Sequence, residues 1–357
     1  MIAIKNDEEQ RATELHHKSL VIDMHSDLQT DIIRRRGQGQ RNVIANRHLP
    51  RQKRGGVDIK VLSTVSRFSF NPYQYYQTPT HSAMQMIDCI YSEIEENPQE
   101  LVLITEVKDI FKAKKEGKLG FLLAMEGAEP LYMDLGLARN FYRLGVREVQ
   151  LTWHHRNLVA DGCAEPSKAG LSNFGKDLVR ELNEMNMIID VAHMSEAGVM
   201  DVIEVSKKPI IASHANARRI CDHRRNLGDE QIIAIAKSGG LIGVMFIGQY
   251  VSKSNQTLED VLDHIDYIST LVGTDHVGVG PDWIDYAPDM ILGAHDVDGG
   301  ILEGGSPLTV FAKGLENVTE LPNLTKGLVS RGYSDEDIQK ILGGNFVRVW
   351  KVIREEE

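Results

Sequence analysis

MIIDVAHMSEAGVMDVIEVSKKPIIASH, the stretch Met187–His214, contains one complete strand–helix–strand unit. Met187–Ala192 and Pro209–Ser213 are apolar runs of strand length, and they are nearly continuous, as is typical of strands covered on both faces. Ala197–Ser206 lies between them and has the spacing of an amphipathic helix. Because a helical crossover joins parallel strands, this stretch predicts a parallel sheet with helices packed outside it.

The same pattern recurs along the rest of the chain. Six further apolar runs have strand length, and they are Leu20–Met24, Val57–Val65, Gly120–Met125, Val146–Leu151, Gly240–Phe246 and His276–Gly280. Segments with helical spacing lie between most of the runs, at 174–185, 229–237 and 258–271 among others. Eight strands that alternate with helices predict an α/β fold of the (β/α)8 TIM-barrel type. A doubly wound open sheet is the structural alternative.

The length of 357 residues fits this interpretation, because an α/β barrel folds as one unit of about 250 residues or more. We find no linker, internal repeat or low-complexity segment, and we therefore expect one barrel domain over residues 1–357. Long insertions at 31–56 and 154–170 follow strands and are expected as loops at the barrel mouth. A Gly-rich loop at 293–305 and C-terminal helices within 320–353 follow the eighth strand.

The composition argues against several functional classes. The chain has 40 Lys and Arg against 51 Asp and Glu, and this net charge of −11 disfavours a nucleic-acid partner. Cys89, Cys163 and Cys221 form no C-x-x-C pair, which argues against a disulfide framework and a thiolate zinc site. The N-terminus lacks the apolar core of a signal peptide, and the longest apolar stretch, near 240–248, is too short to span a bilayer. We expect a soluble cytoplasmic protein without a membrane partner.

Polar side chains stand where the predicted strands end, which is where a barrel carries its working residues. These residues are His25 and Asp27, Glu126, His193, His214 and Asp282. His25 and Asp27 are two positions apart, so on a regular strand they point to the same face. Apart from Asp282, these residues offer three imidazoles and two carboxylates, a set that suits zinc or a related divalent metal and can hold two ions if one carboxylate bridges. A lone histidine at a strand end is often only a hydrogen-bonded residue, but the agreement of five ligand-type residues with the predicted strand ends favours a metal site.

A basic segment interrupts the acidic chain near the first predicted mouth loop. It consists of Arg34, Arg35, Arg36, Arg41, Arg47, Arg51, Lys53 and Arg54. One interpretation is an ordinary solvated loop. The other is that this segment faces the barrel mouth and attracts substrates that carry carboxylates.

Several familiar catalytic motifs are absent or incomplete. No H-E-x-x-H, G-x-S-x-G or G-x-G-x-x-G sequence occurs, which disfavours a helix-borne zinc protease, a serine hydrolase elbow and a dinucleotide fold. The stretch 170–177 imitates a phosphate loop but ends in aspartate where a hydroxyl residue is required. We interpret it as a turn before a helix, with Ser172 or Asn173 as the cap.

Taken together, the motifs of this chain resemble those of the membrane (renal) dipeptidase family of metallopeptidases, in the same order, from about residue 18 to 352. They are VIDMHSD at 21–27, MEG at 125–127, DVAHMS at 190–195, IASHANAR at 211–218, RRNL at 224–227 and GVGPD at 278–282. The resemblance implies a metal-dependent barrel of the amidohydrolase type that binds two Zn²⁺ per chain. The missing signal and anchor suggest the soluble microbial branch, and the family suggests a homodimer.

The resemblance also implies how the metal ligands are shared. His25 and Asp27 match the ligands of the first zinc, His193 and His214 match those of the second, and Glu126 matches the bridging carboxylate. Many amidohydrolases bridge their metals with a carboxylated lysine at the end of the fourth strand. That strand, 146–153, contains no lysine here, which agrees with a bridging glutamate.

Two further residues match functional positions of the family. Arg225 matches the arginine that holds the terminal carboxylate of the substrate, a task that suits a guanidinium fork. Asp282 matches the catalytic aspartate, which takes a proton from the attacking water and passes it to the departing amine. The alternative interpretations are a surface charge beside Arg224 and a structural turn after Pro281.

One position departs from the family pattern. The mammalian enzymes end the fourth strand in a histidine that contacts the reacting carbonyl, whereas this chain has Trp153 there, followed by His154 and His155. Either histidine replaces the missing one from a shifted backbone, or Trp153 reshapes the substrate pocket.

The sequence therefore predicts a binuclear zinc dipeptidase that acts on small dipeptides through a metal-bridging hydroxide. Because the family tolerates a D-residue at the second position, L,D-dipeptides are expected beside L,L-dipeptides. One alternative is another amidohydrolase reaction, such as hydrolysis of a lactone or an N-acyl amino acid. A second alternative is a metal-binding barrel that has lost turnover.

Overall fold

The computed structural model describes residues 6–65, 78–167, 169–284 and 311–356, so the Gly-rich loop expected at 293–305 lies outside the described residues. The strands that form the main parallel ladder are β1 (Ile22–Ser26), β2 (Ile59–Val65), β4 (Leu119–Glu126), β5 (Val146–Gln150), β6 (Ile188–Asp190), β7 (Ile211–Ala212), β8 (Leu241–Val244) and β9 (Val277–Val279). Their order in the sheet follows their order in the chain. A doubly wound sheet would reverse that order at a switch point, so the predicted barrel is confirmed and the open-sheet alternative is wrong.

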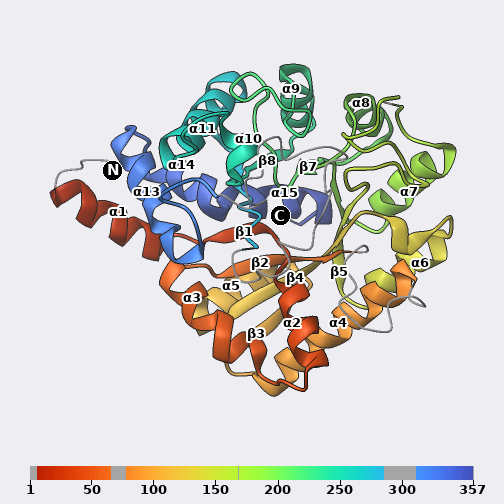
Figure 1. The fold of residues 1–357 in the computed structure, drawn as a ribbon, viewed down its shortest axis with the longest axis horizontal. Coiled ribbons are helices and arrows are strands. Elements are labelled where there is room, and N and C mark those ends of the chain that lie inside the picture. Colours follow the sequence, from red (N-terminus) through yellow and green to blue (C-terminus); the bar gives the residue numbers. More distant parts are fainter. Residues whose placement is uncertain (1–5, 66–77, 168, 285–310, 357) are drawn as a thin grey trace.

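The barrel is nearly closed where its last strand meets its first. A Cβ atom on Gly278 of β9 would lie 2.5 Å from Sδ of Met24 in β1, so these strands touch through a position that has room only for glycine. Helices surround the strands in Figure 1. Those that precede β9 are α1 (Asn6–Lys18), α2 (Leu28–Gly37), α3 (Leu49–Gly55), α4 (Pro79–Glu96), α5 (Val107–Glu116), α6 (Leu135–Arg143), α7 (Asn173–Glu184), α8 (Glu196–Val205), α9 (Asp229–Lys237), α10 (Gly248–Val251) and α11 (Leu258–Val272).

Three C-terminal helices follow β9, the last of them ending one residue beyond the range 320–353 given by the sequence pattern. They are α13 (Pro322–Ser330), α14 (Asp335–Gln339) and α15 (Asn345–Arg354). The predicted cap of α7 is also present, because the Ser172 hydroxyl accepts a hydrogen bond from the Gly175 backbone N–H at 3.0 Å.

Two expectations about the N-terminal half need correction. The segment 31–56 was expected as a loop, but it contains most of α2, a π-helical turn (Ile44–His48) and α3. A ninth strand, β3 (Leu101–Ile104), pairs with the first half of β4, where the sequence pattern gave no separate strand. The second half of β4 pairs with β5 instead, so β3 adds to the barrel wall without entering the main order.

The interior of the barrel is apolar at the end where the strands begin. Ile22 of β1, Ile59 of β2 and Leu241 of β8 belong to one buried cluster. Phe346 and Trp350 of α15 belong to the same cluster, so the C-terminal helix covers this end of the barrel. A larger cluster fills the space between the outer faces of the strands and the surrounding helices.

A β-bulge in β1 sets the direction of His25. Asp23 pairs with Lys60 but Ser26 pairs with Leu62, so three steps along β1 oppose two steps along β2. A regular strand would send His25 and the methionine before it to opposite faces. Met24 belongs to the buried cluster of the barrel interior and His25 to the group around Glu126, so the register shift allows both side chains to point inward.

Two general properties of the described residues bear on the earlier expectations. None of the described helices is both long and apolar enough to cross a membrane. Cys89, Cys163 and Cys221 are free thiols.

Candidate metal centre

The Oε1 atom of Glu126 lies among three imidazole nitrogens at the carboxyl ends of the strands. It is 3.6 Å from Nε2 of His25, 3.3 Å from Nε2 of His193 and 3.8 Å from Nε2 of His214. The Nε2 atoms of His193 and His214 are 2.8 Å apart. All four side chains are buried. Four ring and carboxylate donors from four different strand ends therefore converge on one point.

Two more carboxylates lie near His25, one after the first strand of the barrel and one after the last. Nε2 of His25 is 3.8 Å from Oδ1 of Asp27 and 3.7 Å from Oδ1 of Asp282. Asp27 follows β1 and stands at the N-cap position of α2, so its place depends on the turn after the strand as well as on strand alternation. His25 is common to the Glu126 group and to this pair of aspartates.

These donors fit a pair of divalent ions. Nε2 of His25 and Oδ1 of Asp27 are buried and have no hydrogen-bond partner among the described residues. Bond lengths of about 2.0–2.2 Å around a zinc ion place neighbouring donor atoms roughly 3.4 Å apart, which is close to the separations found here. Three imidazoles with three carboxylates also form the nitrogen and oxygen set that suits zinc.

Burial shifts the pKa values of the site toward the neutral forms. It lowers the pKa of His25 to about 3 and raises the pKa of Asp27 to about 7. Burial, followed by the charge of Asp27, raises the pKa values of Glu126 and Asp282 well above their usual range. Burial also lowers the pKa of His193 well below its usual range. Neutral imidazoles are ready to bind a cation, and a bound cation would favour the ionised carboxylates again.

Hydrogen bonds behind the histidines orient their rings. The Ser213 hydroxyl donates to Asp190 at 2.5 Å and lies 2.7 Å from Nδ1 of His214. A hydroxyl that donates to a carboxylate can accept the proton on Nδ1, which leaves Nε2 of His214 unprotonated toward the site. The Ser63 hydroxyl lies 3.1 Å from Nδ1 of His25 and can act in the same way.

Two site residues hold a backbone conformation that is uncommon outside glycine. His193 has φ +67° and Asp282 has φ +61°, both in the left-handed region. Such conformations cost of order 1–3 kcal/mol and persist where the surrounding structure fixes them. Both residues follow short strands and carry side chains that belong to the converging group.

Arg225 reaches the site from the loop after β7. Its side chain is buried, and Nη2 donates a hydrogen bond to the carbonyl oxygen of His214 at 2.6 Å. Its Nε atom is buried without a hydrogen-bond partner in the described part of the chain. The guanidinium charge also contributes to lowering the pKa of His25, so Arg225 is electrostatically coupled to the site.

The three residues that follow β5 take different places. The Trp153 ring stacks toward the His193 ring, with centroids 6.2 Å apart and planes at 30°. His154 is buried behind the same ring, and the Nδ1 atoms of His154 and His193 are 3.4 Å apart. His155 is half-buried and its Nδ1 lies 3.6 Å from Glu165. Trp153 and His154 therefore contact the candidate centre, whereas the polar contact of His155 is with Glu165.

Sequence reasoning missed the residues behind the ligands. Ser213 and Asp190 stand inside the motifs that carry His214 and His193, so their proximity along the chain was a usable signal. Ser63 gave no signal, because its role depends on the pairing of β2 with β1. Cys163 also escaped notice, although its Sγ atom lies 3.6 Å from Nδ1 of His154.

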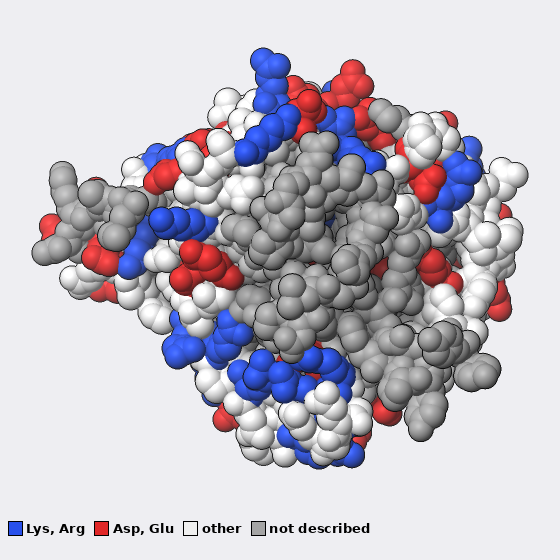
Figure 2. Space-filling model, in the orientation of Figure 1, with Lys and Arg blue, Asp and Glu red and all other residues white. Residues whose placement is uncertain are grey.

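The basic segment has acidic partners for several of its charges. Arg34 and Arg35 each pair with Asp31 at 2.8 Å, and Arg36 pairs with Glu93 at 2.6 Å. Lys and Arg side chains gather in Figure 2 over the lower part of the face, where Figure 1 places α2 and α3. These ion pairs neutralise part of the positive charge of the segment. For the arginines that pair, they favour a structural role over the attraction of acidic substrates.

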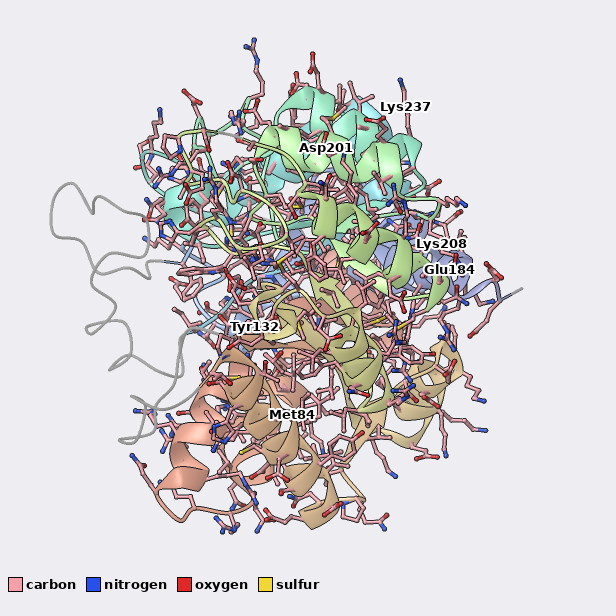
Figure 3. All side chains as sticks on the ribbon, turned by 90° about the vertical axis from the view of Figure 1, so that its right-hand side faces the viewer. Met84, Tyr132, Glu184, Asp201, Lys208 and Lys237 are labelled. Carbon is pink, nitrogen blue, oxygen red and sulfur yellow. The ribbon has the colours of Figure 1, made fainter. Side chains whose placement is uncertain are left out.

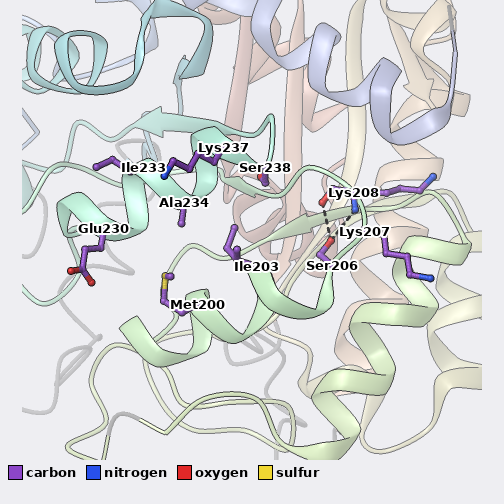
Figure 4. A pocket seen from close by; sticks show the side chains of 10 residues that line it. All are labelled: Met200, Ile203, Ser206, Lys207, Lys208, Glu230, Ile233, Ala234, Lys237 and Ser238. Atoms are coloured by element: carbon purple, nitrogen blue, oxygen red, sulfur yellow. Dashed lines mark hydrogen bonds between the residues drawn. The ribbon is translucent and has the colours of Figure 1, made fainter.

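A separate groove lies on the outer surface of the barrel. It has a volume of about 590 Å³ between α8 and α9, with Met200 and Ile203 facing Ile233 and Ala234 in Figure 4. The view in Figure 3 places Lys237 on this outer surface. Lys237 lies at the end of α9, just before β8 begins, so the groove reaches the opposite end of the strands from the metal-ligating residues.

The chain is similar to known proteins of one family. The model of the family described as membrane dipeptidase (peptidase family M19) matches residues 9–299 and 303–357. Dipeptidase verJ of Clonostachys rogersoniana is 32% identical over 276 residues, covering 77% of this chain and 66% of the relative. Dipeptidase tcpJ of Claviceps purpurea is 31% identical over 275 residues, covering 76% and 60%. The match thus spans about two thirds or less of the length of these relatives.

A solved structure with a similar fold covers nearly the whole chain. An amidohydrolase from Pseudomonas aeruginosa superposes with a TM-score of 0.79 and 28% sequence identity. The superposition covers 97% of this chain and 99% of that protein.

Proposed function

The chain belongs to the membrane dipeptidase family, peptidase family M19, and we propose that it is a binuclear zinc dipeptidase. The observation that carries the proposal is the position of Glu126 Oε1, 3.3–3.8 Å from the Nε2 atoms of three histidines. One carboxylate at the centre of three imidazoles is the arrangement expected when a glutamate bridges two ions. The whole chain would act as one catalytic barrel domain.

The ligand assignment follows the grouping of the donors. His25 and Asp27 would hold one ion, His193 and His214 the other, and Glu126 would bridge them. Two zinc ions, when bound, supply an activated water and polarise the peptide carbonyl. The remaining task of the chain is to orient the dipeptide and to move protons.

We assign the proton transfer to Asp282. Its carboxylate lies within 3.7 Å of Nε2 of His25, at the edge of the metal-ligating group, and cations beside it would keep it ionised. An ionised carboxylate there would take the proton of the attacking water and pass it to the nitrogen of the leaving amine. The backbone of Asp282 is in the left-handed region, a conformation that persists only where the surrounding structure holds it.

We assign binding of the C-terminal carboxylate of the dipeptide to Arg225. One side of its guanidinium is held by the carbonyl oxygen of His214, while the buried Nε atom lacks a partner among the described residues. A guanidinium that is fixed on one edge and open on another can accept a carboxylate with little loss of side-chain entropy. This pairing would also set which end of the dipeptide faces Glu126.

The test is hydrolysis of defined dipeptides. Protein loaded with zinc is assayed against L-alanyl-L-alanine and L-alanyl-D-alanine, with and without a chelator, while metal content is measured in parallel. We expect turnover of at least the L,L-dipeptide, loss of that turnover on chelation and recovery on reloading with zinc. Turnover that survives complete metal removal would overturn the proposal, as would no turnover of any dipeptide with two zinc ions bound.

Trp153 favours a second candidate within the same chemistry. Its indole ring stands beside His193, where the family pattern has a smaller polar ring that contacts the reacting carbonyl. A large apolar face there would suit an N-acyl amino acid or a lactone. Higher kcat/KM for these substrates than for dipeptides would establish this alternative.

A further inference from the structure

A second group of metal-ligating atoms lies directly behind one histidine of the metal centre. Nδ1 of His154 is 3.6 Å from Sγ of Cys163 and 3.4 Å from Nδ1 of His193. The three side chains can offer one ligand atom each, and these atoms lie within 4.8 Å of one another. His154 and His193 are buried, and Cys163 is partly buried.

The backbone holds these three residues in place. The Cys163 N–H donates to the carbonyl oxygen of His193 at 2.6 Å, and the Ala164 N–H donates to the carbonyl oxygen of His154 at 2.9 Å. A Cβ atom on Gly162 would lie 2.3 Å from the backbone carbonyl of His154, so only glycine allows the loop to close this tightly. The cluster is therefore part of a fixed loop.

From this geometry we infer that His154, Cys163 and His193 form an accessory site for a thiophilic divalent cation, such as Zn²⁺ or Cd²⁺. Two nitrogen atoms bonded to one tetrahedral zinc ion lie roughly 3.4 Å apart, and a nitrogen and a sulfur about 3.6 Å, given bonds of about 2.0–2.1 and 2.3 Å. The separations of 3.4 Å between the two Nδ1 atoms and 3.6 Å between Nδ1 of His154 and Sγ of Cys163 match both values. Three protein ligands leave the fourth position of the ion to water.

The accessory site shares one imidazole with the metal centre. Nε2 of His193 faces Glu126 at 3.3 Å, while Nδ1 of the same ring faces His154. Binding at the accessory site releases two protons, one from the Cys163 thiol and one from the His193 ring, which then bonds an ion through each nitrogen. Excess metal would thereby convert a neutral ligand of the catalytic ions into an imidazolate shared with a third ion, and we expect this change of charge at the metal centre to slow hydrolysis.

The inference rests on the proposed function only for the assignment of His193 Nε2 to the catalytic pair. Its experiment therefore measures metal binding first. Protein that already holds two equivalents of zinc is titrated with zinc alone by calorimetry. A parallel titration with cadmium alone follows the ultraviolet thiolate-to-metal absorption. The variants are Cys163→Ser and the matched control Cys89→Ser, whose thiol is half-buried on α4.

We expect wild-type protein and Cys89→Ser to bind a third equivalent and to develop the thiolate absorption. In Cys163→Ser the absorption is lost and the affinity for the third equivalent falls at least about tenfold. His154→Asn gives a second test through the other ligand, with the same loss expected in a chain whose circular dichroism is unchanged. Where dipeptides are hydrolysed, excess zinc slows wild type and Cys89→Ser but not Cys163→Ser.

Two results would overturn the inference. One is a third equivalent that binds Cys163→Ser as tightly as wild type, and the other is wild-type protein that shows neither a third equivalent nor thiolate absorption in excess metal. Failure of the proposed function is distinguishable, because it would appear as no dipeptide turnover while the titrations keep their expected outcome.

Discussion

The two ends of the barrel interior are built from the same strands, but one end is apolar and the other gathers buried polar side chains. Where the strands begin, Ile22, Ile59 and Trp350 form a closed apolar cluster. Where they end, His25 and Glu126 bring polar atoms together under nearly complete burial. A buried polar atom without a partner costs about 1–3 kcal/mol, so the second arrangement is unfavourable until a cation satisfies it. The apolar end therefore stabilises the fold, whereas the polar end lowers the stability of the chain in order to form a candidate binding site.

The largest effect is expected from Asp282→Asn, which tests whether the polar end of the barrel carries the chemistry. Loss of a residue that transfers protons lowers kcat by about 10² to 10⁴-fold, while two metal ions per chain stay bound. The measurement is kcat on a dipeptide together with metal content. Asp177→Asn, an exposed aspartate on α7, is the matched control and should leave kcat unchanged. Unaltered kcat in Asp282→Asn would remove its proposed proton role.

The opposite end should respond in the opposite sense to Trp350→Ala. Removing this fully buried ring leaves a cavity and lowers the free energy of unfolding by about 3–5 kcal/mol. The value of kcat/KM should stay within about threefold well below the unfolding temperature, because the ring lies at the far end of the strands.

Denaturant unfolding and steady-state kinetics check this second prediction. Val352→Ala changes a half-exposed side chain on the same helix and should shift stability by less than about 0.5 kcal/mol. A loss of kcat/KM in Trp350→Ala much larger than threefold would show that the two ends are not independent.

Ser63→Ala tests whether a hydroxyl behind the metal centre orients His25. The hydroxyl lies 3.1 Å from Nδ1 of His25, and loss of a group that orients a metal ligand weakens metal binding about 10–100-fold. Competition with a chromogenic chelator measures the affinity. Thr64→Val removes the neighbouring hydroxyl, which donates to Ala124 O, and should leave metal affinity unchanged. Equal metal affinities in Ser63→Ala and wild type would count against the orienting role.

The smallest expected effect concerns an ion-pair group at the mouth that is structural. Burial alone would raise the pKa of Asp31, but hydrogen bonds from His48, Arg34 and Arg35 outweigh it and hold the pKa well below its usual value. A carboxylate whose pKa is lower in the folded chain stabilises it above the unfolded pKa of about 3.9, and this contribution is lost as the pH falls toward the folded pKa.

Asp31→Asn should therefore lower the free energy of unfolding by about 1 kcal/mol at pH 7, with a difference that shrinks below about pH 4. Urea unfolding at several pH values measures this. Asp335→Asn removes an exposed partner of Arg11 and should change stability by less than about 0.5 kcal/mol. A difference for Asp31→Asn that grew on acidification would contradict the assigned sign.

Much of the fold was predictable because apolar runs and helical spacing are properties of residues close together in the sequence. Each of the eight predicted runs overlaps a strand of the barrel, and 229–237 is the full extent of α9. The errors have local causes as well. β3 has only four residues, fewer than any of the predicted runs. The arginines of α2 concealed a helix whose charges are paired with Asp31.

The sequence by itself determined the order of the strands, the types of donor at their ends and the family. Apolar periodicity and motif order are properties of neighbours along the chain, so both can be read without coordinates. Only the tertiary structure decided that a bulge turns His25 inward, that Ser63 supports it, and that Cys163 lies behind His193. These relations join segments that are distant in sequence. They depend on strand register and loop closure, which the pattern of one segment does not contain.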